Sequence, residues 1–253
     1  MEVAQHTVEL IKKSQDQKLY AEALYWNAYN LMGIDQYDAA IEQFLLAQKA
    51  FLQVSGWNCA ADALFWIGYI PVYTVYGLNN QDIKDALAEF QSLPDPAGMV
   101  MCQVALAHEW DAQSIQTLTS TWEFCISHNL PREQAGCTQC LARVCINFGR
   151  FEEAKKWGLI ALEETKQSNI WTFHVLNIIG NHGSALISLG DYDQAVEYLM
   201  KGLESNKAYG RPLGIIWILF PLGRAWMKKG QKEDARGAFM ETLKYGEMLQ
   251  GAW

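Results

Sequence analysis

The chain has 253 residues, of which half are apolar and 19% charged, and its net charge is −8. This composition supplies enough apolar surface for a packed core and is too hydrophobic for a disordered chain. The negative charge argues against nucleic acid as a partner, because a phosphate backbone is bound by a basic surface.

The sequence shows no sign of membrane insertion or export. No apolar run reaches the roughly 18 residues that a membrane-spanning helix needs, and Met1 is followed by Glu2 and a polar stretch rather than by a signal peptide. The six cysteines fall on predicted helices and not in a small disulfide scaffold. We therefore expect a cytoplasmic protein that does not insert into a membrane.

The sequence of the N-terminal part predicts a short helix followed by a full helix pair. Residues 3–14 have a partial apolar stripe, so we expect residues 1–16 to form an N-terminal helix that covers the end of a stack. Residues 17–33 and 36–54 then predict the first pair. From residue 17 to residue 253 the sequence predicts one helical repeat domain.

The middle of this domain, residues 57–130, is irregular. A long aromatic helix over 57–76 is interrupted by Pro71, which should kink it or end it near Ile70. Its partner is expected at 81–93, and the Leu93-Pro94-Asp95-Pro96 break is the strongest linker signal in the chain. A third pair is expected at 97–110 and 111–128.

The C-terminal part repeats one short phrase at a nearly constant distance. Residues 149–154 (GRFEEA), 190–195 (GDYDQA) and 230–235 (GQKEDA) are 41 and 40 residues apart, and residues 35–40 (DQYDAA) form a fourth copy. A fixed period of this size indicates a stacked helical repeat. The expected pairs are 131–148 with 150–168, 169–189 with 191–207, and 212–229 with 231–249.

Each copy of the phrase is flanked by small residues that let helices cross closely. Seven positions before the turn stand Ala28, Ala142, Gly183 and Gly223, and after it stand Ala40, Ala154, Ala195 and Ala235. On these residues, and most strongly on GRFEEAKKWGLIALEE and GDYDQAVEYLMKGLE, the sequence resembles the tetratricopeptide repeat family. The resemblance implies an all-α, right-handed superhelical solenoid of about six antiparallel helix pairs. The units are longer than the family's period of about 34 residues.

No catalytic or metal-binding motif stands up to scrutiny. Cys137 and Cys140 form a CxxC, but the pair lies within a predicted helix with no preceding strand, which favours structural packing over redox or metal chemistry. The five histidines lack the i, i+4 spacing of a zinc helix. We therefore expect no cofactor and no metal, and the sequence favours a protein that is not an enzyme.

The resemblance implies that the first helix of each pair lines a concave groove. Projecting this register gives an aromatic set in the N-terminal half, namely Tyr25, Trp26, Tyr29, Phe65, Trp66, Tyr69 and Tyr73. It gives a mainly polar set in the C-terminal half, namely Arg143, Asn147, Asn177, Asn181 and Arg224, with Trp217 and Phe220 alongside. The alternative interpretation is that the aromatics fill the core and that the asparagines bridge water.

These features favour a non-enzymatic module that binds a peptide or protein segment in its groove. Asparagine can donate to and accept from a peptide backbone, and arginine can grip a carboxylate. The lysine-rich carboxylate clamp of chaperone-binding members of the family is missing, so a chaperone tail is not the expected ligand. Two alternatives stay open: a small-molecule sensor domain of a larger signalling regulator, with a small apolar or aromatic ligand, and an enzyme with an apolar pocket in the aromatic half. The oligomeric state is also open.

Overall fold

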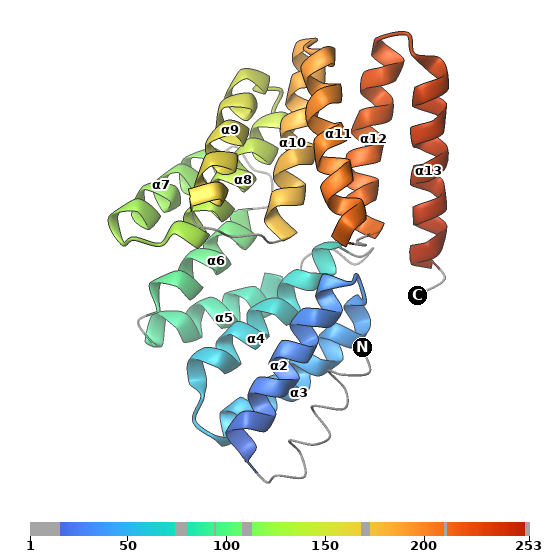
Figure 1. Ribbon diagram of the computed structural model, residues 1–253. Helices are drawn as coiled ribbons and strands as arrows, with labels where there is room; N and C mark the ends of the chain where they lie inside the picture. Colours follow the sequence, from blue (N-terminus) through green and yellow to red (C-terminus); the bar gives the residue numbers. More distant parts are fainter. Residues whose placement is uncertain are drawn as a thin grey trace. The chain divides into compact units, whose positions relative to one another are not determined.

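The computed structural model describes residues 16–73, 80–93, 95–107, 113–167, 173–209 and 212–250, and this part of the chain is helical throughout (Figure 1). The helix expected at 3–14 lies outside the described residues. The helices are α2 (Gln17–Gly33), α3 (Tyr37–Gln53), α4 (Trp57–Tyr69), the 3-10 helix η1 (Ile70–Tyr73), α5 (Asn80–Ser92), α6 (Pro96–Leu106), α7 (Ser114–Ser127), α8 (Pro131–Asn147), α9 (Phe151–Gln167), α10 (Phe173–Leu189), α11 (Tyr192–Tyr209), α12 (Pro212–Lys228) and α13 (Lys232–Gln250). The predicted all-α helical-repeat fold is confirmed.

The chain divides into two compact units, residues 1–106 and residues 107–253. In unit 1 each helix from α2 to α6 packs on the next one along the chain, and the same holds in unit 2 from α7 to α13. In unit 2, α10 also packs on both α8 and α12, so the first helices of three successive pairs lie side by side. The single repeat domain expected from residue 17 to residue 253 stays a prediction.

All four copies of the turn phrase close the first helix in the same way. Gly149, Gly190 and Gly230 have φ values of 72°, 88° and 79°, and Asp35 takes the same left-handed conformation with φ 62°. The next residue's N–H donates to a carbonyl five positions back in each copy, for example from Arg150 to Cys145 at 2.8 Å. This bond satisfies a carbonyl at the helix end. It confirms Asp35 as the counterpart of the three turn glycines.

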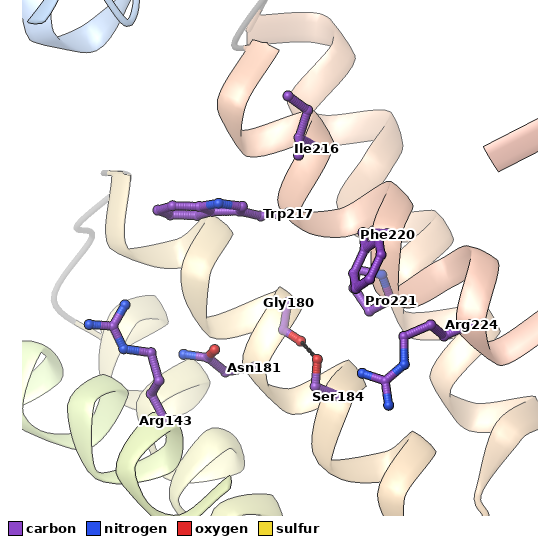
Figure 2. A pocket seen from close by; sticks show the side chains of 9 residues that line it. All are labelled: Arg143, Gly180, Asn181, Ser184, Ile216, Trp217, Phe220, Pro221 and Arg224. Carbon is purple, nitrogen blue, oxygen red and sulfur yellow. Dashed lines mark hydrogen bonds between the residues drawn. The ribbon is translucent and has the colours of Figure 1, made fainter. Parts of the chain in front are cut away.

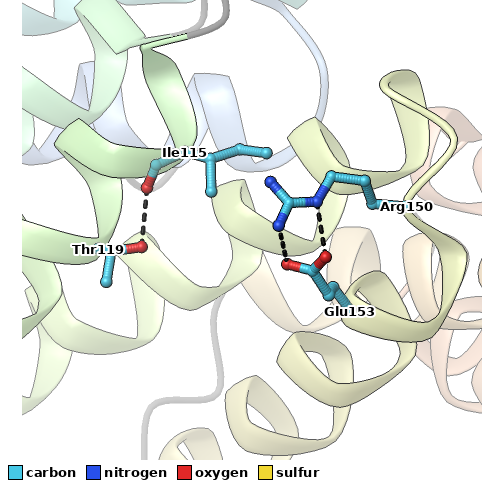
Figure 3. Close-up of polar contacts among 4 residues, drawn as sticks. All are labelled: Ile115, Thr119, Arg150 and Glu153. Carbon is cyan, nitrogen blue, oxygen red and sulfur yellow. Dashed lines mark hydrogen bonds and ion pairs between the residues drawn. The ribbon is translucent and has the colours of Figure 1, made fainter.

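The residue after the turn glycine also shapes the start of the second helix. Arg150 donates through Nε and Nη2 to the two carboxylate oxygens of Glu153, each at 2.6 Å (Figure 3). Glu153 lies in the first turn of α9, where a negative charge interacts favourably with the helix dipole. Both side chains are exposed, so we assign this pair a local role in the turn and little global stability.

Small residues stand where the helices of a pair approach closely. A Cβ on Gly183 would lie 2.5 Å from Leu199, and one on Gly223 would lie 2.6 Å from Phe239. The alanines that follow the turns, Ala40, Ala154, Ala195 and Ala235, are fully buried. The spacing of small residues in the sequence therefore marks the positions at which the two helices of a pair pack closely.

The proline signals of the middle region end one helix and begin another. Pro71 lies in η1, immediately after the end of α4. The Asp95 carboxylate accepts a 3.0 Å hydrogen bond from the Gly98 backbone N–H and so caps α6, which begins at Pro96. Because α5 packs on α6, the predicted linker joins neighbouring helices of unit 1.

Candidate functional site

A pocket of about 460 Å³ opens on the face of unit 2 where α8, α10 and α12 lie side by side (Figure 2). Arg143, Ser184 and Arg224 each stand six residues before a turn glycine, so the three helices present the same repeat position to this pocket. The lining residues are Arg143, Gly180, Asn181, Ser184, Ile216, Trp217, Phe220, Pro221 and Arg224.

The charged groups in the polar lining are both cationic. Arg143 and Arg224 bring two guanidinium groups, and none of the described residues that line the pocket is acidic. The Asn181 Nδ2 is buried without a hydrogen-bond partner among the described residues. Ser184 Oγ donates to the Gly180 carbonyl at 2.8 Å, so its own proton is already used. A ligand that offers carboxylate or carbonyl oxygens would match this set.

The apolar wall comes from α12 and depends on a proline inside that helix. Pro221 has no N–H, so it cannot donate to the Trp217 carbonyl four residues back. That carbonyl oxygen points at α10, and it lies 3.0 Å from the place that a Cβ on Gly180 would take. Trp217 is partly exposed and Phe220 is 52% exposed. Gly180 thus permits the close approach of α12 that sets these rings over the pocket.

The structure gathers five of the predicted groove residues around this pocket, namely Arg143, Asn181, Trp217, Phe220 and Arg224. Asn147 is exposed and does not line it, and the side chain of Asn177 lies outside the described residues. Sequence reasoning missed four lining residues, namely Gly180, Ser184, Ile216 and Pro221. The repeat period contained a signal for three of them, because Ser184 is in register with Arg143, Gly180 with Phe220, and Pro221 with Asn181.

The aromatic set predicted in unit 1 is divided between core and surface. Phe65, Trp66 and Tyr69 are only 4%, 6% and 9% exposed, so they pack in the core, as the alternative interpretation expected. Trp26 is 59% exposed, and Tyr29 beside it is partly exposed. The side chain of Tyr73 lies outside the described residues. The accessible part of the predicted aromatic wall therefore lies mainly on α2.

A polar network joins Tyr25 on α2 to two side chains of α4. The Tyr25 hydroxyl donates to the Asp62 carboxylate, and Trp66 Nε1 donates to the Tyr25 oxygen at 3.2 Å. Burial and the neighbouring Asp62 charge raise the pKa of Tyr25 above its ordinary value. Tyr25 is therefore a protonated donor that ties α2 to α4.

The two cysteines of the CxxC motif, Cys137 and Cys140, lie in α8. Burial raises the pKa of the Cys140 thiol to about 11, and a contact with the Cys125 sulfur, together with burial, raises the pKa of Cys137. Both cysteines are buried and suited to packing rather than to nucleophilic attack. Within the described ranges, no three His, Cys, Asp or Glu side chains are grouped to hold a metal ion. In the same part of the chain, no helix has the length and apolarity to cross a bilayer.

Comparison with known proteins agrees with this architecture. Residues 176–209, which span most of α10 and α11, match the tetratricopeptide repeat family. No curated protein sequence matches the chain.

Solved structures with a similar fold include a Rap protein complexed with competence and sporulation factor, at a TM-score of 0.69 and 13% identity over 98% of this chain and 81% of that one. BtubC (BKLC) from P. vanneervenii has a TM-score of 0.60 at 16% identity over 87% and 92% of the two chains. Aspartyl phosphate phosphatase F from Bacillus subtilis has a TM-score of 0.58 at 14% identity over 95% and 74%. At such identities the likeness concerns the fold.

Proposed function

We propose that this tetratricopeptide-like helical-repeat chain is a non-enzymatic module that binds a peptide or protein segment on the inner face of its first helices. The observation that carries the proposal is the pocket of unit 2, where three successive first helices combine two arginines, an asparagine and two aromatic rings. The buried Nδ2 of that asparagine, Asn181, has no hydrogen-bond partner among the described residues. Such a lining can recognise a chain without any reacting group.

The lining residues divide naturally between polar and apolar contacts to a peptide. Asn181 would donate its free Nδ2 protons to a backbone carbonyl or a carboxylate of the ligand. Arg143 and Arg224 would pair with acidic groups, since a guanidinium presents two parallel N–H donors to a carboxylate. Trp217 and Phe220 would cover an apolar side chain, because aromatic rings bury a large area at small entropic cost. Asn147 and Asn177, on the same helices, remain proposed contacts beyond the pocket.

The comparisons support the proposal at the level of the fold. The solved structure of the Rap protein contains competence and sporulation factor, so a chain of this architecture can hold a ligand. The six cysteines of this chain are all free thiols, which is consistent with the reducing cytoplasm in which we place it.

The proposal can be tested by selecting random dodecapeptides displayed on phage against the immobilised full chain. We expect enriched peptides in which an acidic group lies close to an apolar side chain. Synthetic copies should bind the parent chain in calorimetry and should lose at least about tenfold in affinity, or about 1.4 kcal/mol, on Arg224→Ala and on Asn181→Ala.

Arg236→Ala is the matched control, because Arg236 is an exposed arginine on α13 that does not line the pocket. Its affinity should equal that of the parent. The absence of any enriched peptide, or equal losses in all three variants, would overturn the proposal.

A small-molecule sensor is a second candidate, favoured by the volume of the pocket. About 460 Å³ falls within the range of roughly 300 to 1,000 Å³ that ligand sites span. Native mass spectrometry after incubation with cell extract separates the two functions. An added mass of kilodaltons would indicate a peptide or protein segment, and an added mass of a few hundred daltons would indicate the sensor.

A further inference from the structure

Unit 1 contains a duplicated acidic and aromatic motif that unit 2 lacks. Residues 22–29 read EALYWNAY and residues 62–69 read DALFWIGY, one 40-residue repeat apart. Each copy has an acidic residue, then two adjacent aromatic residues three and four positions later, then a tyrosine at the eighth position. Glu22, Tyr25, Trp26 and Tyr29 occupy the register of Trp217, Phe220, Pro221 and Arg224 in the last repeat. The first copy therefore stands at repeat positions that line the pocket in unit 2.

The two copies interlock through their side chains. Tyr25 of the first copy donates to Asp62 of the second and accepts from Trp66 of the second. Tyr29 packs edge to face against Trp66, with ring centroids 5.7 Å apart. Because Trp66 is almost fully buried, the second copy serves as a rigid base under the first.

The side chain left at the surface is Trp26, although two neighbouring rings hold it in place. Its ring lies edge to face against Tyr25 at 5.5 Å and against Tyr29 at 5.9 Å, yet it is 59% exposed. Glu22 lies one helical turn before Trp26 on the same face of α2. We call Glu22, Trp26, Tyr29 and Asp62 the aromatic–acid surface.

The charges around this surface are negative. The pKa of the Cys59 thiol on α4 reflects these charges. Burial raises this pKa most, the Asp62 and Glu22 charges raise it further, and the Lys18 charge lowers it. The excess of negative charge extends through unit 1. Residues 1–106 hold 12 acidic and five basic side chains, whereas residues 107–253 hold 16 acidic and 15 basic side chains. A positively charged group is thus attracted to unit 1 far more than to unit 2.

We infer that the aromatic–acid surface of unit 1 binds the guanidinium group of an arginine side chain in a peptide or protein segment. The planar guanidinium stacks on the exposed Trp26 ring, and its N–H groups face the carboxylates of Glu22 and Asp62. Arginine fits better than lysine, because a guanidinium is planar, more weakly hydrated and able to stack on an aromatic face. The inference extends the proposed function to a second subsite and does not depend on the pocket of unit 2.

The test uses the full chain with its tryptophan indole groups labelled with 15N. The Trp26 signal is identified as the one that disappears in Trp26→Phe. The chain is titrated with N-acetyl-arginine amide and with N-acetyl-citrulline amide, which has the same shape without the charge. The arginine probe should shift the Trp26 signal saturably, and the citrulline probe should bind at least about fivefold more weakly.

Two variants locate the effect. Glu22→Gln removes one charge at a half-buried position and should weaken the arginine probe by roughly threefold to tenfold. Arg224→Ala alters only the pocket of unit 2 and should leave the arginine affinity unchanged while it weakens the selected peptides. No saturable shift, equal affinities for arginine and citrulline, or an unchanged affinity in Glu22→Gln would overturn the inference and leave the pocket of unit 2 unaffected.

Discussion

The backbone carbonyl oxygen of Trp217 lies 3.0 Å from the point that a Cβ on Gly180 would occupy, so the spacing of α10 and α12 depends on a missing methyl group. The neighbour is backbone, which cannot turn aside as a flexible side chain can. Gly180→Ala gains helix propensity of roughly 0.5 to 1 kcal/mol, but overpacking costs about 1 to 3 kcal/mol. We expect the free energy of unfolding in urea to fall by about 1 kcal/mol and the affinity for selected peptides to fall with it.

Gly237→Ala is the control for that change. Gly237 is exposed on α13 and has no atom within 4 Å of the added Cβ. The helix propensity of alanine then acts alone, and the free energy of unfolding should rise by about 0.5 to 1 kcal/mol. If both alanine variants were stabilised, the close approach of α12 would not be what requires glycine at position 180.

Asn181→Ala should separate binding from stability. The Asn181 Nδ2 is buried and has no partner among the described residues, so the folded chain loses no internal hydrogen bond from that nitrogen when the amide is removed. Leaving out an unsatisfied buried donor is neutral or stabilising. We expect an unchanged or higher midpoint of urea unfolding together with the tenfold loss of peptide affinity. A clear loss of stability would indicate that the amide serves the fold.

The repeat architecture could be predicted because it depends on residues close together in the sequence, such as those that begin helices and form turns. Pro131 and Pro212 begin α8 and α12 where the sequence places them, and Asp35 takes the turn conformation of the glycines. The rotation of each helix was harder to predict, because it depends on neighbours distant in sequence. Phe65 and Trp66 share a register with exposed groove positions but are buried once α4 packs between α3 and α5.

The pocket itself shows a second limit of the sequence. Its hollow exists because α10 carries Gly180 and Ser184 at repeat positions where α12 carries Phe220 and Arg224. Projection of the repeat register, together with residue type, marked Arg143, Asn181 and Arg224 as candidates, since charged and amide groups suggest recognition. The small residues that make the space become visible only when the repeats are aligned and the helices packed.

Substitution of Glu164 should destabilise unit 2. The Glu164 carboxylate accepts from Trp122 Nε1 at 2.9 Å, Gln134 Nε2 at 2.6 Å and Thr138 Oγ1 at 2.7 Å, and so joins α9 to α7 and α8. Glu164→Gln replaces one acceptor oxygen by a donor. Because a partly buried donor then loses its partner, the free energy of unfolding should fall by about 1 to 3 kcal/mol in urea.

Glu163→Gln is the matched control on the same helix. Glu163 is 61% exposed, and its carboxylate lies 4.0 Å from the Lys166 ammonium, which is a weak surface pair. The free energy of unfolding should change by less than about 0.5 kcal/mol. Equal effects of the two substitutions would show that the three hydrogen bonds to Glu164 add nothing to stability.

His182 should make unit 2 sensitive to mild acid. Its ring is 4% exposed, packs against Tyr198 with centroids 4.9 Å apart, and has a buried Nδ1 without a partner among the described residues. Burial and the Lys155 charge lower its pKa below the ordinary value, against a hydrogen bond to the Lys155 backbone that raises it. The unfolded chain therefore takes up the proton first as the pH falls. The stability due to neutral His182 is complete above the ordinary pKa of about 6.5 and is lost as the pH falls from there toward the lowered pKa of the folded chain.

The measurement is urea unfolding of the full chain at pH 7.5, 6.5, 5.5 and 5.0. One proton contributes a slope of at most about 1.4 kcal/mol per pH unit. His182→Gln should reduce the fall in the free energy of unfolding as the pH is lowered, because glutamine does not titrate and can still donate to the Lys155 carbonyl. If His182→Gln kept the slope of the parent chain, the acid sensitivity would belong to the carboxylates, and the buried imidazole would be a packing group alone.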